Sequence, residues 1–489
     1  LLVLEAERYF GEKKKRCTPA EMERLVAVAL DYCRIDISSI EAVACTAYKN
    51  EHLPEKLRDV KWLAEHTVEL GGRSFPALVL NHHLAHAAMV HAFAGVDDVV
   101  IDVCDGGGDF GDTHCIYRCR DHQITQLPNQ PVHDAFSSRF YDVVSRYLYG
   151  RIMCEGKLMA LASLGTARPD MTRYVREHLA MFHQAPAEVS CAELRRTFPV
   201  ESYAQSEVAF DLAASAQRVF EELRVESVAA LPADAPFVLL AGGATLNILA
   251  NTRVRAHLGR DRRLLVPPCC DDTGQSLGAL LYYCHERAGV PVTAAMPFIG
   301  YSDRLGEPAL SAEDATDELV SFLASGGIVF LHRGQSEIGP RALGHRSILA
   351  LPTRRSYDII NHVIKQREFY RPLAPLVPLE SVSSWFDWEG ESQYMLYAAD
   401  ATSRTRLAAP GICHYDNSAR LQTIDREGDP FLHALLHRVG QLTGVPILIN
   451  TSLNPQGAPI LSKLASTQAF RRQMGSLNVR VFHEGELGE

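Results

Sequence analysis

The sequence predicts an α/β protein of more than one domain, on the strength of three observations. Short β-branched runs are followed by glycine-containing loops and then by helical patterns, an alternation typical of α/β folds. The chain has 489 residues, which is too long for one hydrophobic core. After about residue 300 the pattern changes to strands that end in loops rich in Arg, Gly and Pro. We therefore expect a boundary between residues 300 and 325 and place it at 310, which gives domains 1–310 and 311–489.

The composition excludes several classes of protein. The chain has 49 Lys and Arg against 59 Asp and Glu, and this net charge of −10 argues against non-specific binding to nucleic acid or to an anionic membrane. No apolar run is long enough to predict a transmembrane helix, and no signal peptide is recognisable. The twelve cysteines are scattered without repeated metal-type spacing, as in reduced intracellular proteins. We expect a cytoplasmic globular protein without a nucleic acid or membrane partner.

The N-terminal segment 1–80 contains a predicted strand, a helix and a second strand. The segment LLVLEAERYF (1–10) has the pattern of an interior strand that runs into charged residues. TPAEMERLVAVALDYC (18–33) is a helical pattern, and Thr18 with Glu21 forms a capping-box signature before it. ALVL (77–80) is a short apolar run that predicts a strand.

Four histidines lie in the next predicted helix, NHHLAHAAMVHAF (81–93). Asn81 is a good N-cap, and an apolar stripe follows at positions 84, 85, 88, 89 and 92. His82 and His86 are four residues apart, so their rings share one face and can hold a transition metal if carboxylates complete the site. The alternative is a pair of capped or solvated histidines. His83 and His91 lie off that face and are not expected to be ligands.

The predicted strand VVIDVCD (99–105) ends in Asp105 and the glycine run DGGG, and CIYRC (115–119) is the predicted returning strand. A carboxylate at the end of a strand lies where open α/β sheets bind ligands. Glycines such as Gly106 and Gly107 allow close approach of the backbone and can form an anion-binding nest. The alternative is a tight hairpin turn that an Asp caps.

Two further loops repeat this strand, turn and helix order. FVLLAGGATLNILAN (237–251) contains Gly242 and Gly243 before a helix from about Thr245, which indicates either a nucleotide-binding turn or a packing turn. In CCDDTG (269–274), one of Asp271 and Asp272 can cap the helix that begins near Gly274, and the other can bind a metal. Two histidines and two carboxylates suit Fe(II), Zn or Mn better than Ca.

Basic and polar loops dominate the last third of the chain. Arginines bind phosphates through two hydrogen bonds at once, and lysine supplies a point charge. Each loop alone could form surface salt bridges, but together they predict a site for a small anion in a chain of net negative charge. The residues are Arg341 and Arg346 in GPRALGHRS, Lys365, Arg367 and Arg371 in KQREFYRP, and Asn450, Thr451, Ser452 and Asn454 in NTSLN.

Eight segments, in order along nearly the whole chain, resemble the O-carbamoyltransferases of antibiotic and nodulation-factor biosynthesis. They are NHHLAHA, DVCDGGGDFGDTH, EGKLMALASLG (155–165), LAGGATLN, CCDDTGQSLGAL, GPRALGHRSIL, KQREFYRPLAP and PILINTSLNPQGAPI. The resemblance implies a larger actin/sugar-kinase-like domain (1–310) and a smaller α/β domain (311–489) similar to threonylcarbamoyl-adenylate synthases.

The resemblance also implies the activity. The smaller domain would form carbamoyl-adenylate from carbamoyl phosphate and ATP with Mg, and the larger would transfer the carbamoyl group to a hydroxyl of a small-molecule secondary metabolite. Fe(II) is the implied cofactor, although the ligand set also allows Zn or Mn, and a homodimer is one allowed assembly. The acceptor itself is not identified by the sequence.

The family's functional positions carry over onto this chain residue by residue. The implied metal ligands are His82, His86, Asp105 and Asp272, the last chosen over Asp271 from its spacing to Leu277 and Gly278. The implied nucleotide contacts of the larger domain are Gly106, Gly107, Lys157, Gly242, Gly243 and Asn247. In the smaller domain Arg341, Arg346, Arg367, Asn450 and Asn454 would bind carbamoyl phosphate and ATP, and Lys365, Arg371, Arg420 and Ser452 would be catalytic.

One departure from the family and two alternative functions remain. Members begin with a loop that contains a His-Asp pair, whereas this sequence begins at the following segment, so the general base for transfer is not identified. The first alternative is a small-molecule kinase of the same superfamily, which leaves the basic loops unexplained. The second is an inactive nucleotide-binding protein.

Overall fold

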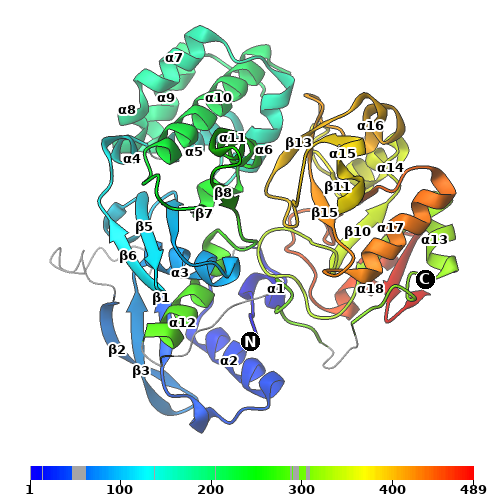
Figure 1. Ribbon diagram of the computed structural model, residues 1–489, viewed down its shortest axis with the longest axis horizontal. Helices are drawn as coiled ribbons and strands as arrows, with labels where there is room; N and C mark the ends of the chain where they lie inside the picture. The colour runs from blue at the N-terminus through cyan, green and yellow to red at the C-terminus, as the bar shows by residue number, and fades with distance from the viewer. Residues whose placement is uncertain are drawn as a thin grey trace. The chain divides into compact units, whose positions relative to one another are not determined.

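A computed structural model describes residues 2–13, 15–46, 62–136, 138–203, 205–286, 289, 297–303 and 309–488. The fold is mixed α/β, as predicted, and divides into two compact units (Figure 1). The central unit comprises residues 40–295, and the composite unit comprises residues 1–39 together with 296–489. The structure thus differs from the predicted division at residue 310, because the N-terminal segment 1–39 belongs to the C-terminal unit.

The central unit contains two sheets. The smaller has the strand order β1-β3-β2, and the larger has the order β6-β5-β4-β7-β8. Strand β4 pairs antiparallel with β5 and parallel with β7, which is parallel to β8, so that β4, β7 and β8 end at one edge. The strands are β1 (Val43–Thr46), β2 (Trp62–Leu70), β3 (Arg73–Leu80), β4 (Val99–Cys104), β5 (His114–Arg120), β6 (Gln123–Leu127), β7 (Phe237–Ala241) and β8 (Arg263–Leu265).

In the central unit, helices α3, α4 and α11 contact strands of the larger sheet, and helices α5 to α10 form a group that packs together (Figure 1). Helix α3 contacts α12 and strands β4, β5 and β7, and it is buried on nearly every side instead of along one stripe. Helix α10 contacts α5, α6, α7 and α11. The helices are α3 (His82–Ala94), α4 (Pro131–Ala135), α5 (Arg139–Tyr149), α6 (Glu155–Leu161), α7 (Pro169–Glu177), α8 (Leu179–Gln184), α9 (Ala187–Thr197), α10 (Glu207–Ala229), α11 (Ile248–Leu258) and α12 (Gln275–Glu286).

The composite unit contains a seven-stranded sheet of order β15-β11-β16-β10-β9-β17-β18 and a small sheet of order β12-β13-β14. Helices α13 and α17 bury Leu319, Phe431 and Leu435 in the core over the larger sheet. The strands are β9 (Ile328–His332), β10 (Arg346–Ala350), β11 (Ala374–Pro378), β12 (Phe386–Asp387), β13 (Ala398–Ala401), β14 (Ser418–Arg420), β15 (Gln422–Ile424), β16 (Leu448–Ser452), β17 (Val479–His483) and β18 (Glu486–Gly488).

The helices of the composite unit come from both parts of the chain (Figure 1). Helix α2 begins with the predicted capping box between Thr18 and Glu21. The helices are α1 (Ala6–Phe10), α2 (Pro19–Cys33), α13 (Asp317–Ala324), α14 (Arg354–Asp358), the π-helical turn η7 (Ile359–Ile364), α15 (Val382–Trp385), α16 (Ser403–Ala408), α17 (Pro430–Thr443) and α18 (Leu464–Gln473).

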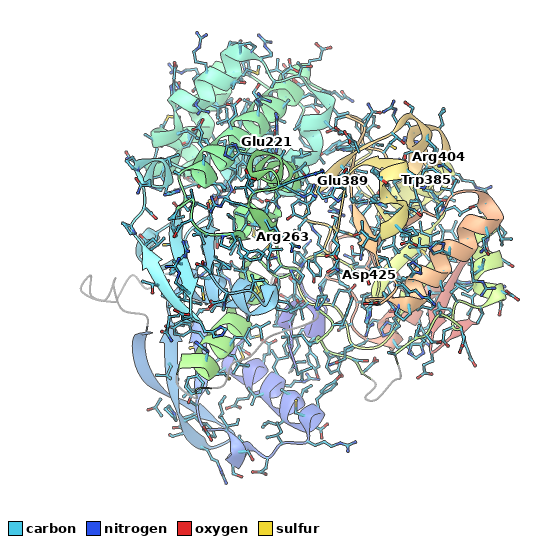
Figure 2. All side chains as sticks on the ribbon, viewed as in Figure 1. Glu221, Arg263, Trp385, Glu389, Arg404 and Asp425 are labelled. Carbon is cyan, nitrogen blue, oxygen red and sulfur yellow. The ribbon has the colours of Figure 1, made fainter. Side chains whose placement is uncertain are left out.

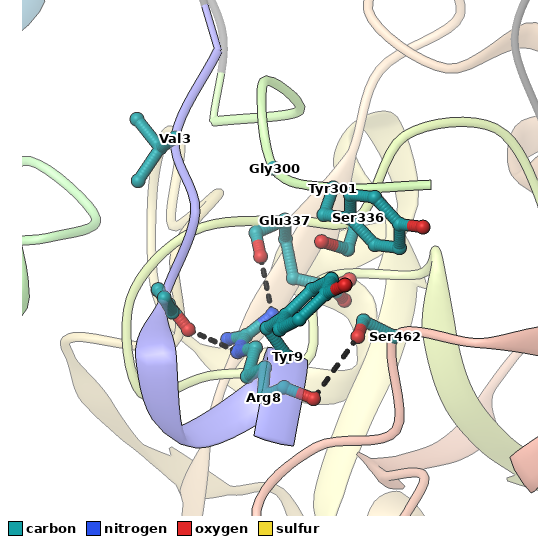
Figure 3. A pocket seen from close by; sticks show the side chains of 9 residues that line it. Val3, Arg8, Tyr9, Gly300, Tyr301, Ser336, Glu337 and Ser462 are labelled. Carbon is teal, nitrogen blue, oxygen red and sulfur yellow. Dashed lines mark hydrogen bonds and ion pairs between the residues drawn. The ribbon is translucent and has the colours of Figure 1, made fainter. Parts of the chain in front are cut away.

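Buried polar contacts attach the N-terminal segment to the composite unit. The guanidinium of Arg8 is buried and donates to the carbonyl oxygens of Glu337 and Gly339, and Glu5 accepts a hydrogen bond of 2.7 Å from the Gly339 amide. Figure 3 shows the contact of Arg8 with Glu337 beside a small pocket lined by Val3, Tyr9, Gly300, Tyr301, Ser336 and Ser462. The predicted strand at residues 1–10 is wrong, because among the described residues 2–10 only Val3 forms a β-bridge and residues 6–10 form helix α1.

A buried ion pair anchors strand β4 in the central unit. Asp102 accepts hydrogen bonds from Arg224 (2.9 Å), His114 (3.1 Å) and Ser227 (3.0 Å), and the side chains of Asp102 and Arg224 are fully buried. Burial alone would raise the pKa of Asp102, but the charges of Arg224 and His114 bring it below its ordinary value of 3.8. The carboxylate therefore stays ionised at neutral pH and depends on its partners.

We expect Arg224→Met to destabilise the protein by about 3–5 kcal/mol, because it leaves the buried Asp102 carboxylate without its guanidinium partner. Since the folded pKa of Asp102 lies below the unfolded one, the pair stabilises the fold above about pH 4, and this contribution falls as the pH drops further. Urea unfolding followed by circular dichroism at several pH values measures both effects.

The matched control is Arg253→Met. Arg253 of helix α11 is half-exposed and forms an ion pair with Glu221 of helix α10 (Figure 2). A pair of this kind contributes about 1 kcal/mol or less. Equal losses of stability in the two variants would contradict the structural role of the buried pair.

Candidate functional site

The four predicted metal ligands converge at one edge of the larger sheet of the central unit. The Nε2 atoms of His82 and His86 lie 3.1 and 3.2 Å from Oδ2 of Asp105, and 3.5 and 3.4 Å from Oδ1 of Asp272. These four atoms all lie within 4.8 Å of one another. Metal bonds of about 2.0–2.2 Å in a tetrahedral arrangement separate the ligand atoms by about 3.3 Å. The donor set therefore fits a transition metal without rearrangement.

Backbone amides from both glycine turns donate hydrogen bonds to the carboxylate of Asp105. Its Oδ1 accepts hydrogen bonds from the amides of Gly106 (2.7 Å) and Gly243 (3.2 Å), which leaves Oδ2 toward the histidines. Gly242 has a φ of 86°, and a Cβ there would lie 2.1 Å from the carbonyl oxygen of Cys104. Only glycine fits this position, because β7 must end close against β4 for the Gly243 amide to reach Asp105.

Three contacts hold helix α3 so that its histidines face the site. Asp109, fully buried, accepts a 2.6 Å hydrogen bond from the His82 amide, and the Gln275 side chain donates to the His82 carbonyl at 3.2 Å. A Cβ at Gly278 would lie 2.0 Å from the carbonyl oxygen of Ala85, so glycine lets α12 pack closely on α3. The sequence analysis missed Asp109, although the second aspartate of DGGGD was a visible signal.

The charges of the site balance one another. Burial would lower the pKa of His86, but hydrogen bonds and charges from Asp105 and Asp272 raise it to about 9. Burial first and the neighbouring His82 second lower the pKa of His83 to about 3, and neither nitrogen of the His83 ring has a hydrogen-bond partner within the described residues. Two carboxylates thus require cationic compensation, which a divalent metal would also supply.

The two neighbouring aspartates after β8 have separate positions. Asp271 caps a short 3₁₀ turn and accepts a 3.3 Å hydrogen bond from the Thr273 amide. Asp272 directs its carboxylate at the histidines, and its side chain is 63% exposed. One side of the candidate metal centre is therefore open to solvent, which leaves room for a ligand that is not part of the protein.

Two further predicted nucleotide contacts of this unit, Asn247 and Lys157, contact other side chains of the protein. Asn247 caps helix α11 through the Ala250 amide (3.1 Å) and exchanges hydrogen bonds with Gln217, so α11 begins at Ile248 and not at Thr245. The ammonium of Lys157 lies 5.8 Å from the ring centre of Tyr149. A Cβ at Gly106 or Gly107 would meet no atom within 4 Å, so the structure supplies no packing reason for these two glycines.

A cluster of five cationic side chains forms in the composite unit. Burial and the charges of Arg367 and Arg371 lower the pKa of Lys365 well below 10.5. Burial also lowers the pKa of Arg420 well below 12.5, and nearby arginines, first of all Arg341, add to the shift. Burial, followed by the charge of Arg371, lowers the pKa of Arg367 to about 9. Such mutual repulsion is relieved by a bound anion, and we call this group, residues 341, 365, 367, 371 and 420, the cationic cluster.

Lys365 links this cluster to strand β16. Its buried ammonium donates to Ser452 through the backbone carbonyl and Oγ (3.0 Å), and to Asn454 through the carbonyl (3.1 Å) and the side-chain oxygen. The π-helical turn η7 precedes Lys365, and Gln366 has a φ of 45°, which non-glycine residues adopt at a cost. Departures of this kind concentrate at functional sites.

Two residues that the sequence analysis missed hold the basic loop in place. Asn361, fully buried, accepts a 2.6 Å hydrogen bond from Arg367 and donates to the Arg371 carbonyl at 2.9 Å. The Tyr357 hydroxyl donates to the same carbonyl at 3.2 Å. A lone asparagine in the apolar run DIINHVI was the available signal.

Two predicted anion ligands make different contacts. The fully buried guanidinium of Arg346 donates to the carbonyl oxygens of Arg333 (2.6 Å) and Gly334 (2.8 Å), and therefore shapes the loop before β10. Asn450 donates to Gln422 (2.7 Å) and to a loop carbonyl. In these contacts Arg346 and Asn450 support the surrounding loops. The charge of Arg346 is not among the causes of the shifted pKa values in the cationic cluster.

Comparison with known proteins establishes the family. Residues 41–281 match the family model described as carbamoyltransferase N-terminus, and residues 320–482 match that described as carbamoyltransferase C-terminus. The first match lies within the central unit and the second within the composite unit. The chain belongs to the carbamoyltransferase family, as the resemblance predicted, and is an enzyme of that class.

Curated relatives agree with this assignment. The chain is 30% identical to the nodulation protein NolO of Bradyrhizobium diazoefficiens, over 79% of this chain and 75% of the relative. It is 33% identical to a 3'-hydroxymethylcephem-O-carbamoyltransferase of Amycolatopsis lactamdurans, over 66% of this chain and 63% of the relative. An uncharacterized Synechocystis protein is 30% identical over 90% of this chain and 80% of its own length.

Solved structures are more distant. A ROK family protein from Streptococcus pneumoniae aligns with 56% of this chain and 89% of its own length, at 10% identity and a TM-score of 0.27. HypF of T. kodakarensis aligns with 42% of this chain and 36% of its own length, at 16% identity and a TM-score of 0.25. Within the described residues, none of the helices is both long and apolar enough to cross a membrane.

We expect inorganic phosphate or pyrophosphate to raise the melting temperature of the protein, because an anion relieves the repulsion within the cationic cluster. At about 100 times the dissociation constant, a ligand stabilises the folded state by about 2.7 kcal/mol. Arg420→Met should lose most of this increment, as measured by thermal unfolding at constant ionic strength with chloride as reference. Arg426→Met removes an exposed arginine outside the cluster and should keep the increment; an equal loss in both variants would contradict an anion site at the cluster.

Proposed function

We propose that this carbamoyltransferase is an ATP-dependent O-carbamoyltransferase that modifies a hydroxyl of a small-molecule secondary metabolite. The cationic cluster is the observation that carries the proposal. Five positive side chains, of which Lys365, Arg367 and Arg420 have depressed pKa values, suit a ligand with several phosphate groups, such as ATP beside carbamoyl phosphate. Transfer directly from carbamoyl phosphate would need fewer charges.

The first step is assigned to the composite unit. Carbamoyl phosphate reacts with water to give carbamate and inorganic phosphate, and a carbamate oxygen then attacks the α-phosphorus of ATP. Pyrophosphate leaves and carbamoyl-adenylate forms, with Mg bound to the ATP phosphates. Lys365, Arg371 and Arg420 would neutralise the charge that builds up on the phosphates, and Ser452 would orient Lys365. Arg341, Arg367 and Asn454 complete the proposed binding site.

The second step is assigned to the central unit. The acceptor oxygen attacks the carbamoyl carbon, the bond to AMP breaks, and the hydroxyl proton is lost. His82, His86, Asp105 and Asp272 would hold Fe(II), with Zn or Mn as other ions that suit the donor set. A bound ion of this kind supplies a Lewis acid that polarises an oxygen of the substrate. Gly106, Gly107, Gly242 and Gly243 form the turns beside it, where the adenylate would bind.

The relatives support the proposed class of acceptor. One is named for a nodulation function and another for O-carbamoylation of a hydroxymethylcephem. The second name points to a hydroxyl on a specialised small molecule. We further propose that the central unit is of the actin/sugar-kinase type and that the composite unit is of the threonylcarbamoyl-adenylate-synthase type. The mixed sheet β6-β5-β4-β7-β8, with the candidate metal ligands at one edge, supports the first assignment.

We expect the two steps to separate in single variants. With ATP, carbamoyl phosphate and a panel of hydroxylated antibiotics and oligosaccharides, the wild type should release pyrophosphate and form carbamoylated product. His82→Ala should still release pyrophosphate but lose product formation by about 100-fold or more, because second-step chemistry needs the metal ligands. Coupled pyrophosphate detection and mass spectrometry of the product measure the two steps.

The reciprocal variant is Lys365→Met, which should lose both pyrophosphate and product. Arg426→Met serves as the surface control and should resemble the wild type. A phosphorylated acceptor in place of a carbamoylated one would instead support a kinase. Nucleotide binding without pyrophosphate release under any condition would support an inactive nucleotide-binding protein and contradict the proposal.

A further inference from the structure

A second group of metal-ligand residues lies at the other end of helix α3. His91 is in the last turn of this helix, Asp97 is in the turn before β4, and Cys119 is near the end of β5. The sulfur of Cys119 lies 3.2 Å from Nε2 of His91 and 3.7 Å from Oδ1 of Asp97. One donor atom from each residue lies within 4.8 Å of the others. The thiol is fully buried, and the other two residues are partly buried.

These distances suit a bound ion. With zinc–sulfur bonds of about 2.3 Å and zinc–nitrogen or zinc–oxygen bonds of about 2.1 Å, a tetrahedral site separates the sulfur from either other ligand by about 3.6 Å. The separations of 3.2 and 3.7 Å agree with this value within a few tenths of an ångström. A thiolate and a carboxylate would also neutralise a divalent charge, with a neutral imidazole as the third ligand.

The surroundings orient each ligand. The ring of His91 directs Nε2 at the thiol, at 3.2 Å. Oδ2 of Asp97 accepts a 2.8 Å hydrogen bond from the Asp121 amide, and Oδ1 accepts one of 3.2 Å from the His122 amide and lies 3.7 Å from the sulfur. The ring of His122, in the same turn, lies 6.5 Å from that of His91 between centres, and His122 is outside the group of three whose donor atoms gather.

A third group in the composite unit provides a contrast. His433 and His437 of helix α17 both direct Nε2 at the same oxygen of Glu380, at 2.8 and 2.5 Å. These distances are shorter than the separation of about 3.3 Å that two ligands of one tetrahedral ion require. The arrangement is that of direct hydrogen bonds, and an ion would have to push the side chains apart.

We propose that His91, Asp97 and Cys119 form a zinc site with three protein ligands, separate from the candidate centre at His82 and His86. The donor set of sulfur, nitrogen and oxygen favours zinc over the harder cations. The two sites share helix α3, and at 1.5 Å per residue the five to nine residues between their histidines span about 8–13 Å. Zinc would tie the end of α3 to the β5–β6 hairpin and so fix the helix that presents His82 and His86.

Cobalt substitution tests this site without reference to catalysis. The whole protein is freed of metal with a chelator and titrated with Co(II) while its absorption spectrum is recorded. We expect two ions per chain and a thiolate-to-cobalt charge-transfer band in the near ultraviolet, which Zn(II) then removes. Cys119→Ala and His91→Gln should each bind one ion fewer, and Cys119→Ala should lose the band. His82→Ala should lose the other ion and keep the band, since no cysteine belongs to that centre.

The control is Cys191→Ala, which removes a partly buried thiol of the same unit whose sulfur contacts the Val143 carbonyl. It should keep both ions and the band. Retention of the remaining ion and of the circular dichroism spectrum shows that the site variants are folded. Absence of the band from the wild type, or a band that persists in Cys119→Ala, overturns the proposal and leaves a hydrogen-bonded thiol–imidazole pair.

Discussion

The carboxylate of Asp105 is the contact on which the candidate metal centre depends, because its two oxygens have different partners. Backbone amides from two glycine turns bind one oxygen, and this directs the other at the histidines of α3. The two amides can reach the same oxygen only if β4 and β7 end side by side, which Gly242 permits. Three residues before Asp105, within β4, the buried ion pair between Asp102 and Arg224 fixes this strand to α10. Strand position and ligand direction are thus set by neighbouring residues of one short segment.

The two units have opposite electrostatic character at their candidate sites. In the central unit, two carboxylates face two imidazoles and raise the pKa of His86, which favours a bound cation. In the composite unit, buried cations lower one another's pKa values, which favours a bound anion. One chain therefore offers separate binding environments for a polyphosphate ligand and for a transition metal.

The local parts of this architecture could be predicted from the sequence, and the long-range parts could not. Strand ends such as Asp105 and the spacing of His82 and His86 are local patterns that indicate candidate ligands, whereas the choice of Asp272 over Asp271 came from the family resemblance. Asp109 and Asn361 were missed, because a single buried polar residue has no periodic signal. The attachment of Arg8 to carbonyls in a distant part of the chain, those of Glu337 and Gly339, was missed for a similar reason. Arg346 looked like an anion ligand, but sequence cannot show that backbone carbonyls already surround its guanidinium.

The discontinuity of the composite unit has a consequence for synthesis on the ribosome. Residues 1–39 emerge before the central unit, yet the segments they pack against begin at residue 296. The central unit lies between them and can fold as soon as it is complete. At about 5–20 residues per second, the following 190 or so residues take roughly 10–40 s to appear. During that interval helices α1 and α2 have no composite core to join, so their apolar side chains are available to chaperones until the last strands are made.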